Sequence, residues 1–241
     1  MDAIFSLADL QHLVAIKLVF FAFLAVSAWG VYTERKPAFF VWVASIATAA
    51  AYYLLVNDLE LSFWGLTADE LTIAAMYQQF AHGSLASDFA YAGFVPFYPS
   101  LFFQFFGLAG RLLDLNGVQI AKFAVFFTFL LFPPLLYFIQ KIYWTNRRAS
   151  DSPRTFAWVL GAGFVFLFAG WDAVITKPYE LVSAVSVILW SAYLLHDVYT
   201  DHMTTMRTIA HGVLGGLLFW MFYFWFFLAA IGIALFNFFQ S

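Results

Sequence analysis

The sequence is poor in charged residues and contains no cysteine. Only 10% of its 241 residues are Asp, Glu, Lys or Arg, whereas a soluble domain has about 25%. This low charge excludes a soluble globular enzyme, and the high hydrophobic content excludes a disordered chain. The absence of cysteine excludes a disulfide framework and a thiolate metal site. No basic tract suited to nucleic acid occurs, and a net charge of −3 is too small to indicate a partner.

Positive residues are also missing from the first segment, Met1 to Gln11, which carries Asp2 and Asp9. A secretory signal peptide begins with a positive region and ends at a small-residue cleavage site. We therefore expect the first hydrophobic segment to be a retained membrane helix.

Hydrophobic residues make up 64% of the chain, and many stand in long runs. A helix needs about 20 apolar residues to cross the bilayer core. We predict an all-α integral membrane protein, with residues 1–241 forming one multi-pass domain of about six transmembrane helices. The predicted crossings are Leu13–Thr33, Ala38–Val56, Val118–Tyr143, Phe156–Val174, Leu181–Tyr199 and Thr208–Phe239.

The distribution of Lys and Arg predicts the orientation, because these residues favour the cytoplasmic side. The loop around Arg35 and Lys36 and the segment Lys141–Arg154 are both basic, so an even number of crossings should separate them. The apolar stretch Ser100–Leu113 must then not cross. As a helix it would measure about 21 Å, short of the roughly 30 Å core. We predict that it lies in the interface, that residues 57–117 form a large outer loop, and that both termini lie outside.

The outer loop contains an acidic helix start, Thr67-Ala68-Asp69-Glu70, in which Glu follows Thr by three residues as in a capping box. We expect this interfacial helix to run to His82 and end at Gly83. Two interpretations of the acidic pair stay open at this point. The carboxylates either stabilise the helix N-terminus or take part in chemistry on the outer face.

Farther along the loop, Asp88-Phe89-Ala90-Tyr91 is followed by Val95-Pro96-Phe97-Tyr98-Pro99, whose prolines rule out a continuous helix. We expect Ser100 to cap the second interfacial helix and Gln104 and Arg111 to form its outward polar stripe. Tyr98 is either an aromatic residue of the membrane interface or a substrate contact.

These residues, in this order, resemble the GT-C glycosyltransferases, which are polytopic enzymes that use polyprenyl-phosphate sugars. Asp88 to Tyr91, Phe97-Tyr98-Pro99, Gly110-Arg111-Leu112 and Ala173 to Glu180 are similar to the N-terminal membrane domain of the galactan arabinofuranosyltransferases of arabinogalactan synthesis. The resemblance covers roughly Leu66 to Asp197. It implies transfer of arabinofuranose from a polyprenyl-phosphate donor to a cell-wall polysaccharide at the inner (cell) membrane.

The resemblance also implies roles for residues. Asp69 would be the general base, with Glu70 beside it. Of the few outer basic residues, Arg111, Lys122 and Lys177, the last is the best candidate to hold the leaving phosphate, because it stands at the outer end of two predicted crossings. Other interpretations stay open: Lys177 is an interfacial anchor or pairs with Glu180, Lys122 extends to the outer surface, and Asp172 pairs with Lys177 or binds sugar hydroxyls. The predicted substrate-binding residues are Asp88, Tyr91, Tyr98, Arg111, Lys122, Asp172, Lys177, Tyr179 and Glu180.

Members of that family are longer than this chain, so a second hypothesis is a non-catalytic membrane subunit, or half of such an enzyme, that binds lipid-linked sugar or a partner protein. No metal ligand set is predicted, although a divalent cation is left open as a cofactor. The polar residues near the fifth crossing are interpreted as a solvated inner loop rather than a metal cluster; they are His196, Asp197, Asp201 and His202.

Overall fold

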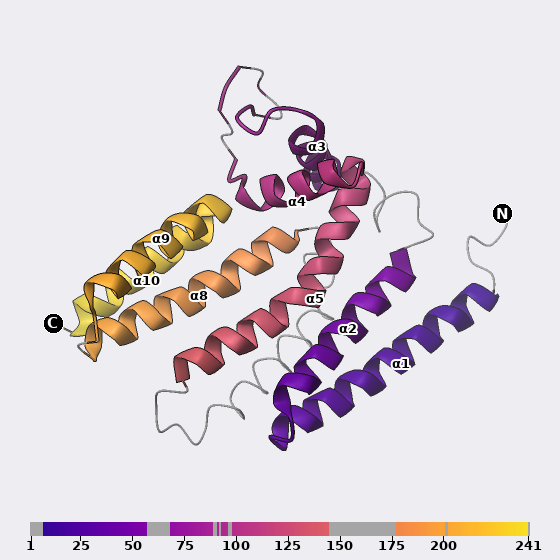
Figure 1. Ribbon diagram of the computed structural model, residues 1–241, viewed down its shortest axis with the longest axis horizontal. Coiled ribbons are helices and arrows are strands. Elements are labelled where there is room, and N and C mark those ends of the chain that lie inside the picture. The colour runs from indigo at the N-terminus through magenta and orange to yellow at the C-terminus, as the bar shows by residue number, and fades with distance from the viewer. Residues whose placement is uncertain are drawn as a thin grey trace. The chain divides into compact units, whose positions relative to one another are not determined.

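The computed structural model describes residues 7–56, 68–88, 91, 93–95, 98–144, 177–200 and 202–240. All the regular structure in these residues is helical, which confirms the all-α part of the predicted fold class for the described residues (Figure 1). The eight helices are α1 (Leu7–Tyr32), α2 (Pro37–Val56), α3 (Ala68–His82), α4 (Leu101–Leu112), α5 (Gly117–Trp144), α8 (Pro178–Tyr199), α9 (Thr205–Met221) and α10 (Tyr223–Gln240).

Four of the described helices are long and apolar enough to cross a membrane: α1, α2, α5 and α8. They coincide with four of the six predicted crossings. The predicted crossing Phe156–Val174 lies outside the described residues. The chain is therefore a multi-pass membrane protein, with at least these four candidate spans.

The last predicted crossing is wrong, because Thr208–Phe239 is not one helix. The helix breaks at Phe222, whose backbone is extended (φ −166°, ψ 98°), and α10 returns alongside α9 and α8. The Tyr199 hydroxyl, at the end of α8, donates a hydrogen bond to the Asn237 side-chain oxygen near the end of α10. The end of α10 thus lies with the end of α8, whereas the prediction placed these two ends on opposite sides of the membrane. The length of the run explains why it cannot be one crossing: a single helix over it would measure about 48 Å, far more than the bilayer core of about 30 Å.

The chain divides into two compact units, and the boundary falls inside α5. The first unit contains α1, α2 and α5 from Lys122 onward. The second contains α3, α4, the first turn of α5, and α8 to α10.

In the first unit, α1 and α2 form an antiparallel hairpin around a tight turn. Val31 and Val41 are buried together near the turn, and Tyr52, near the end of α2, is buried with Val125 of α5. Gly30 allows the close approach, because a Cβ there would lie 2.1 Å from the Phe40 ring.

The second unit has two parts, the pair α3–α4 and the bundle α8–α10. Helix α3 packs on α4, and Gly107 permits this contact because a Cβ there would lie 2.5 Å from Cβ of Phe80. Helices α8, α9 and α10 form an antiparallel bundle in which Trp190 stacks on Phe226 with ring centroids 5.4 Å apart. The N-terminal end of α4 meets this bundle where Trp220 donates a hydrogen bond to the Ser100 hydroxyl (3.3 Å).

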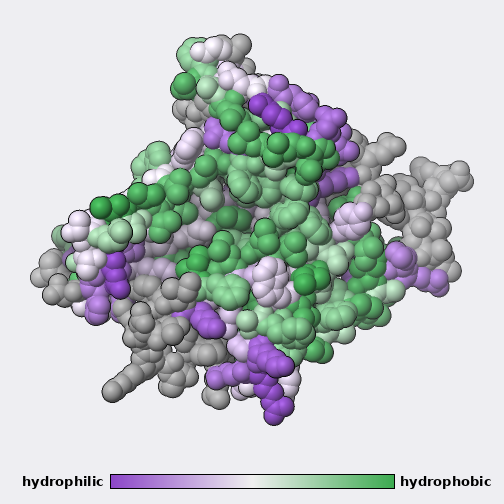
Figure 2. Space-filling view, in the orientation of Figure 1, coloured by the Kyte–Doolittle hydropathy of each residue, from purple (hydrophilic) through white to green (hydrophobic). Residues whose placement is uncertain are grey.

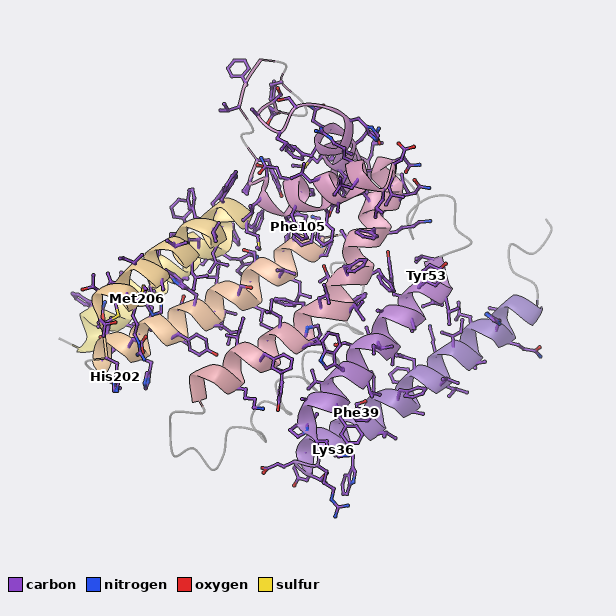
Figure 3. All side chains as sticks on the ribbon, viewed as in Figure 1. Lys36, Phe39, Tyr53, Phe105, His202 and Met206 are labelled. Atoms are coloured by element: carbon purple, nitrogen blue, oxygen red, sulfur yellow. The ribbon has the colours of Figure 1, made fainter. Side chains whose placement is uncertain are left out.

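Hydrophobic side chains cover most of the described surface in Figure 2, as expected for helices that face lipid. Hydrophilic side chains gather over α3, at the turn between α8 and α9, and at the turn between α1 and α2. Figure 3 shows Lys36 at the α1–α2 turn, His202 and Met206 at the α8–α9 turn, and the exposed Phe105 on α4. Hydrophilic side chains thus gather over α3 and at two turns between long helices, and such turns are where membrane helices reach water.

One of the residues predicted to lie in a solvated inner loop is buried instead. Asp197 belongs to the last turns of α8, and its side chain is 4% exposed. Its carboxylate accepts hydrogen bonds from Arg207 (2.9 Å) and pairs with His211 (3.2 Å) on α9. A buried carboxylate needs such partners to offset the loss of hydration. His202 is exposed, as expected for a loop, and Asp201 lies outside the described residues.

Candidate functional site

The candidate site lies in the second unit, where the start of α3 meets the residue before α8. Helix α3 begins at Ala68, so Asp69 and Glu70 occupy its first turn, as predicted. The predicted end at His82 is confirmed, whereas the capping residue Thr67 lies outside the described residues. Acidic residues in a first turn are stabilised by the partial positive charge of the helix N-terminus.

The two carboxylates have different environments, because neighbours on a helix point about 100° apart. The Asp69 side chain is 68% exposed, whereas Glu70 is buried at 8% exposure. An exposed carboxylate can meet a substrate hydroxyl, and a buried one cannot do so without rearrangement. The geometry thus separates the pair, and only Asp69 is placed for chemistry at the surface.

Lys177 makes a short ion pair with Asp69. Its Nζ lies 2.7 Å from Oδ2 of Asp69 and 4.0 Å from Oε1 of Glu180, and its side chain is 30% exposed. The hydrogen bond to Asp69 raises the pKa of Lys177, assisted by the charge of Glu180 and opposed by burial. Lys177 is therefore a fixed cation at neutral pH, held immediately before Pro178 at the start of α8.

A chain of hydroxyl groups leads from the loop to α8. The Tyr179 hydroxyl donates to Oε1 of Glu180 (3.3 Å) and lies 3.0 Å from the Tyr98 hydroxyl. Because a phenol carries one proton, Tyr98 is then the donor in the second bond. Burial raises the pKa of Tyr98, so this hydroxyl keeps its proton at neutral pH. The site therefore combines one cation, two carboxylates and two neutral phenols.

Aromatic packing fixes the position of Tyr179, which is only 3% exposed. Its ring centroid lies 4.9 Å from that of Phe103 on α4 and 5.5 Å from that of Phe222, at the break between α9 and α10. Phe222 thus places the break between α9 and α10 against Tyr179, so the break helps to hold this side chain in position. Sequence reasoning missed this residue because nothing distinguishes it from its apolar neighbours, and it also missed the contact between Ser100 and Trp220.

Ser100 occupies the N-cap position of α4 as predicted, but its side chain makes no capping hydrogen bond. Its hydroxyl instead accepts the hydrogen bond from Trp220 on α9. Ser100 is almost fully buried at this junction, with 1% of the residue exposed. Its role is therefore to join α4 to the α8–α10 bundle.

Arg111 is engaged by the C-terminal end of α3. Its guanidinium donates to the carbonyls of Ala81 (2.5 Å), Gly83 (2.5 Å) and Phe80 (3.4 Å). The last carbonyls of a helix have no partner within the helix, and a cation there also offsets their partial negative charge. Gln104, the other residue of the predicted polar stripe, donates to the carbonyl of Leu85. Both polar side chains of α4 thus tie α4 to α3 and to the chain that follows it.

The other predicted site residues that the structure describes, Asp88, Tyr91 and Lys122, form hydrogen bonds that do not involve the Asp69–Lys177 ion pair. Asp88 is buried, and its Oδ1 accepts from the Tyr91 amide (3.0 Å), which closes the loop and leaves the Tyr91 side chain exposed. Lys122, in the first unit, donates to the carbonyl of Val56 at the end of α2 (3.2 Å). Asp172 lies outside the described residues. Among the predicted site residues, the structure groups Asp69, Tyr98, Lys177, Tyr179 and Glu180.

Comparison with protein families, with curated proteins and with solved structures finds no match to this chain. The resemblance to the GT-C glycosyltransferases therefore stays a prediction based on the residues quoted for it.

Proposed function

We propose that this protein is a multi-pass membrane glycosyltransferase that moves a sugar, arabinofuranose, from a polyprenyl-phosphate donor to a cell-envelope polysaccharide on the outer face of the membrane. The observation that carries the proposal is the ion pair of Asp69 and Lys177 at the start of α8. A membrane protein offers few places where an exposed carboxylate and a fixed cation stand together at a helix end. The sequence resemblance to the arabinofuranosyltransferases supports the identity of the substrates.

The two charges suit the two halves of a transfer reaction. The acceptor hydroxyl oxygen forms a bond to the anomeric carbon of the sugar and gives its proton to the Asp69 carboxylate. The bond between that carbon and the phosphate oxygen breaks, and the electron pair leaves on the phosphate. The Lys177 ammonium, which is charged at neutral pH, stabilises that anion. General base catalysis of this kind contributes roughly 10²–10⁴-fold to a rate.

The neutral phenols and Glu180 position the reacting groups in this proposal. Tyr98 and Tyr179 form the hydrogen-bonded chain that ends on Glu180, and Glu180 lies 4.0 Å from the Lys177 ammonium. Lys177 thus lies within 4.0 Å of both Asp69 and Glu180, the two carboxylates that would otherwise suit a divalent cation. The proposal therefore routes no step through a metal.

A transfer assay with the purified chain, a labelled polyprenyl-phosphate sugar and an oligosaccharide acceptor tests the proposal. Asp69→Asn keeps the shape of the side chain and removes the base, so we expect a rate loss of about 100-fold or more. Lys177→Met should lose activity as well. Asp114→Asn is the matched control, because Asp114 is an exposed carboxylate at the turn between α4 and α5. Equal activity of Asp69→Asn and Asp114→Asn would remove Asp69 from the mechanism.

One observation favours the second candidate, a non-catalytic subunit or half enzyme that binds lipid-linked sugar or a membrane protein partner. The charges of Asp69 and Lys177 neutralise each other, as expected if the pair only joins α3 to α8. The charge swap Asp69→Lys with Lys177→Asp separates the two roles. In a structural pair, the swap restores the stability lost in either single variant and leaves function intact. In the transferase, the swap puts the carboxylate at position 177 and the ammonium at position 69. Activity then stays lost, because the base is no longer at position 69, while stability returns.

A further inference from the structure

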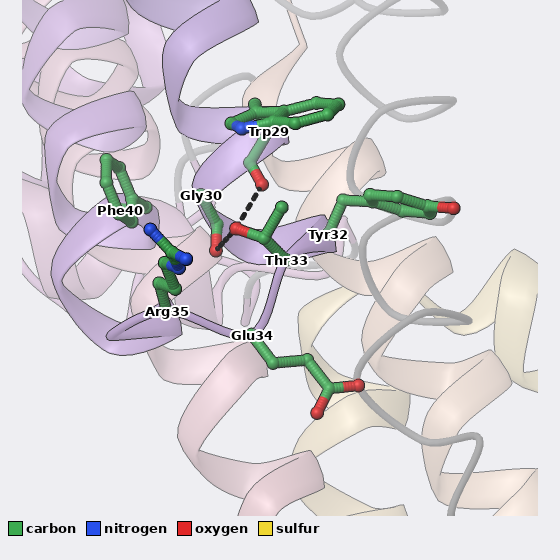
Figure 4. A pocket seen from close by; sticks show the side chains of 7 residues that line it. All are labelled: Trp29, Gly30, Tyr32, Thr33, Glu34, Arg35 and Phe40. Atoms are coloured by element: carbon green, nitrogen blue, oxygen red, sulfur yellow. Dashed lines mark hydrogen bonds between the residues drawn. The ribbon is translucent and has the colours of Figure 1, made fainter.

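A pocket in the first unit lies at the turn between α1 and α2, and the proposed function does not use it. Its volume is about 670 Å³, and it is lined by Trp29, Gly30, Tyr32, Thr33, Glu34, Arg35 and Phe40 (Figure 4). The pocket lies where the candidate spans of α1 and α2 end, at Tyr32, and begin, at Pro37. Helix ends of this kind lie at the level of the lipid head groups.

The backbone of the turn presents Arg35 to this pocket. Glu34 and Lys36, on either side of Arg35, have left-handed backbone angles (φ 58° and 51°), which are uncommon for residues other than glycine. Figure 4 shows the Arg35 side chain directed back toward Gly30 and Phe40, with Glu34 directed the opposite way. Residues held in such backbone conformations cluster at active sites, ligand clamps and switch regions.

Arg35 is not used to cap α1. The Thr33 hydroxyl lies 2.9 Å from the carbonyl oxygen of Trp29 and 3.4 Å from that of Gly30, so Thr33 serves the last turn of the helix. Within the part of the chain that the structure describes, no carboxylate lies within ion-pair distance of Arg35. The guanidinium therefore offers its planar array of donors to a ligand, and that array matches the oxygens of a phosphate.

We propose that this pocket binds the phosphate group of an anionic phospholipid of the inner leaflet. The turn is one of the basic loops that the positive-inside rule places at the cytoplasmic face, where anionic lipids gather. Trp29 and Tyr32 are 68% and 45% exposed, and such aromatic side chains favour the boundary between head groups and acyl chains. Basic pockets between membrane helices on this face are suited to anionic head groups. The Arg35 guanidinium binds the phosphate, and the Trp29 and Phe40 rings contact the glycerol and upper acyl region.

Native mass spectrometry of the detergent-purified full chain tests this site. The probes are dioleoyl phosphatidylglycerol and, for comparison, dioleoyl phosphatidylcholine. We expect retained phosphatidylglycerol to exceed phosphatidylcholine in the wild type, and Arg35→Gln to lower phosphatidylglycerol binding about fivefold. Lys141→Gln is the matched control, because it removes an exposed positive charge near the end of α5 that does not line the pocket. Arg35→Lys should keep part of the binding, and size-exclusion profiles and helical circular dichroism check that each variant is folded.

The outcomes separate the sources of phosphate. Loss of phosphatidylglycerol in Arg35→Gln but not in Lys141→Gln supports the site. Equal losses in both variants would show only general attraction to surface charge, and no loss in either would show that Arg35 binds no lipid; both results overturn the proposal. Displacement of phosphatidylglycerol by millimolar inorganic phosphate would identify a site for free phosphate and also overturn it.

Discussion

The Asp69 carboxylate lies 2.7 Å from the Lys177 ammonium, although these residues belong to segments far apart in the sequence. The contact joins the first turn of α3 to the residue that precedes α8. It places the one exposed member of the acidic pair beside a cation that is itself 30% exposed. In the proposed reaction, this contact must open for the acceptor hydroxyl and the donor phosphate to enter.

The ion pair predicts a characteristic pH dependence of stability. The pKa of Lys177 is raised above its ordinary value of 10.5, so its contribution is fully present at lower pH and is lost as the pH rises through the folded pKa. Because both side chains are partly exposed, the contribution should be at most about 1 kcal/mol. The thermal unfolding midpoints of wild type and Lys177→Met should differ by a constant amount between pH 6 and pH 9 and converge above pH 10.5. A difference that changes across the neutral range would assign the effect to another group.

Arg111 should act on the stability of α3. Arg111→Met removes charged donors from the carbonyls of Ala81 and Gly83, which should destabilise the α3 C-terminus by about 1.5–3 kcal/mol. Hydrogen exchange of the backbone amides in the last turn of α3 measures the effect, with Arg35→Met, in the other unit, as the control. Unchanged protection in Arg111→Met would mean that the guanidinium does not hold these carbonyls in solution.

Gly107 offers a test of the contact between α3 and α4. A Cβ at this position would lie 2.5 Å from Cβ of Phe80 and 3.0 Å from its carbonyl carbon, so Gly107→Ala must push the helices apart. Overpacking of this kind costs about 1–3 kcal/mol. Gly216→Ala is the matched control, because Gly216 lies within α9 and has open space around its Cβ position. There the same change should be neutral or stabilising by up to about 1 kcal/mol. Denaturant unfolding that ranks the two variants alike would contradict the α3–α4 packing.

Local sequence signals predicted much of this fold. The acidic start and Gly83 predicted the bounds of α3, because caps and helix stops depend on neighbouring residues. Length and loop charge predicted that Ser100–Leu113 is a short interfacial helix, and the structure has a helix of 12 residues there. Whether it lies in the interface stays a prediction.

The parts that sequence reasoning missed depend on tertiary contacts. Phe222 stands in an unbroken apolar run, and its break is stabilised by packing on Tyr98 and Tyr179 from other elements. Asp197 stands among polar residues and was interpreted as solvated, but it pairs with Arg207 and His211 on the next helix. The sequence offered Asp172 and Glu180 as partners of Lys177. The structure confirms the pairing with Glu180 at 4.0 Å and adds a shorter one, with Asp69, a residue of a distant segment.

Cysteine accessibility in intact cells tests the central claim most directly, because the chain has no cysteine of its own and the proposed reaction requires the α3 side to face outward. Ser84, His202 and Asn237 are exposed residues of the second unit; Ser84 follows α3, whereas the other two lie at the opposite end of the α8–α10 bundle. With a membrane-impermeant maleimide, Ser84→Cys should be labelled, and His202→Cys and Asn237→Cys should be protected until the cells are opened. Protection of Ser84→Cys, with labelling of His202→Cys, would place Asp69 on the cytoplasmic side and contradict an outer-face transferase. Labelling of Asn237→Cys together with Ser84→Cys would contradict the return of α10.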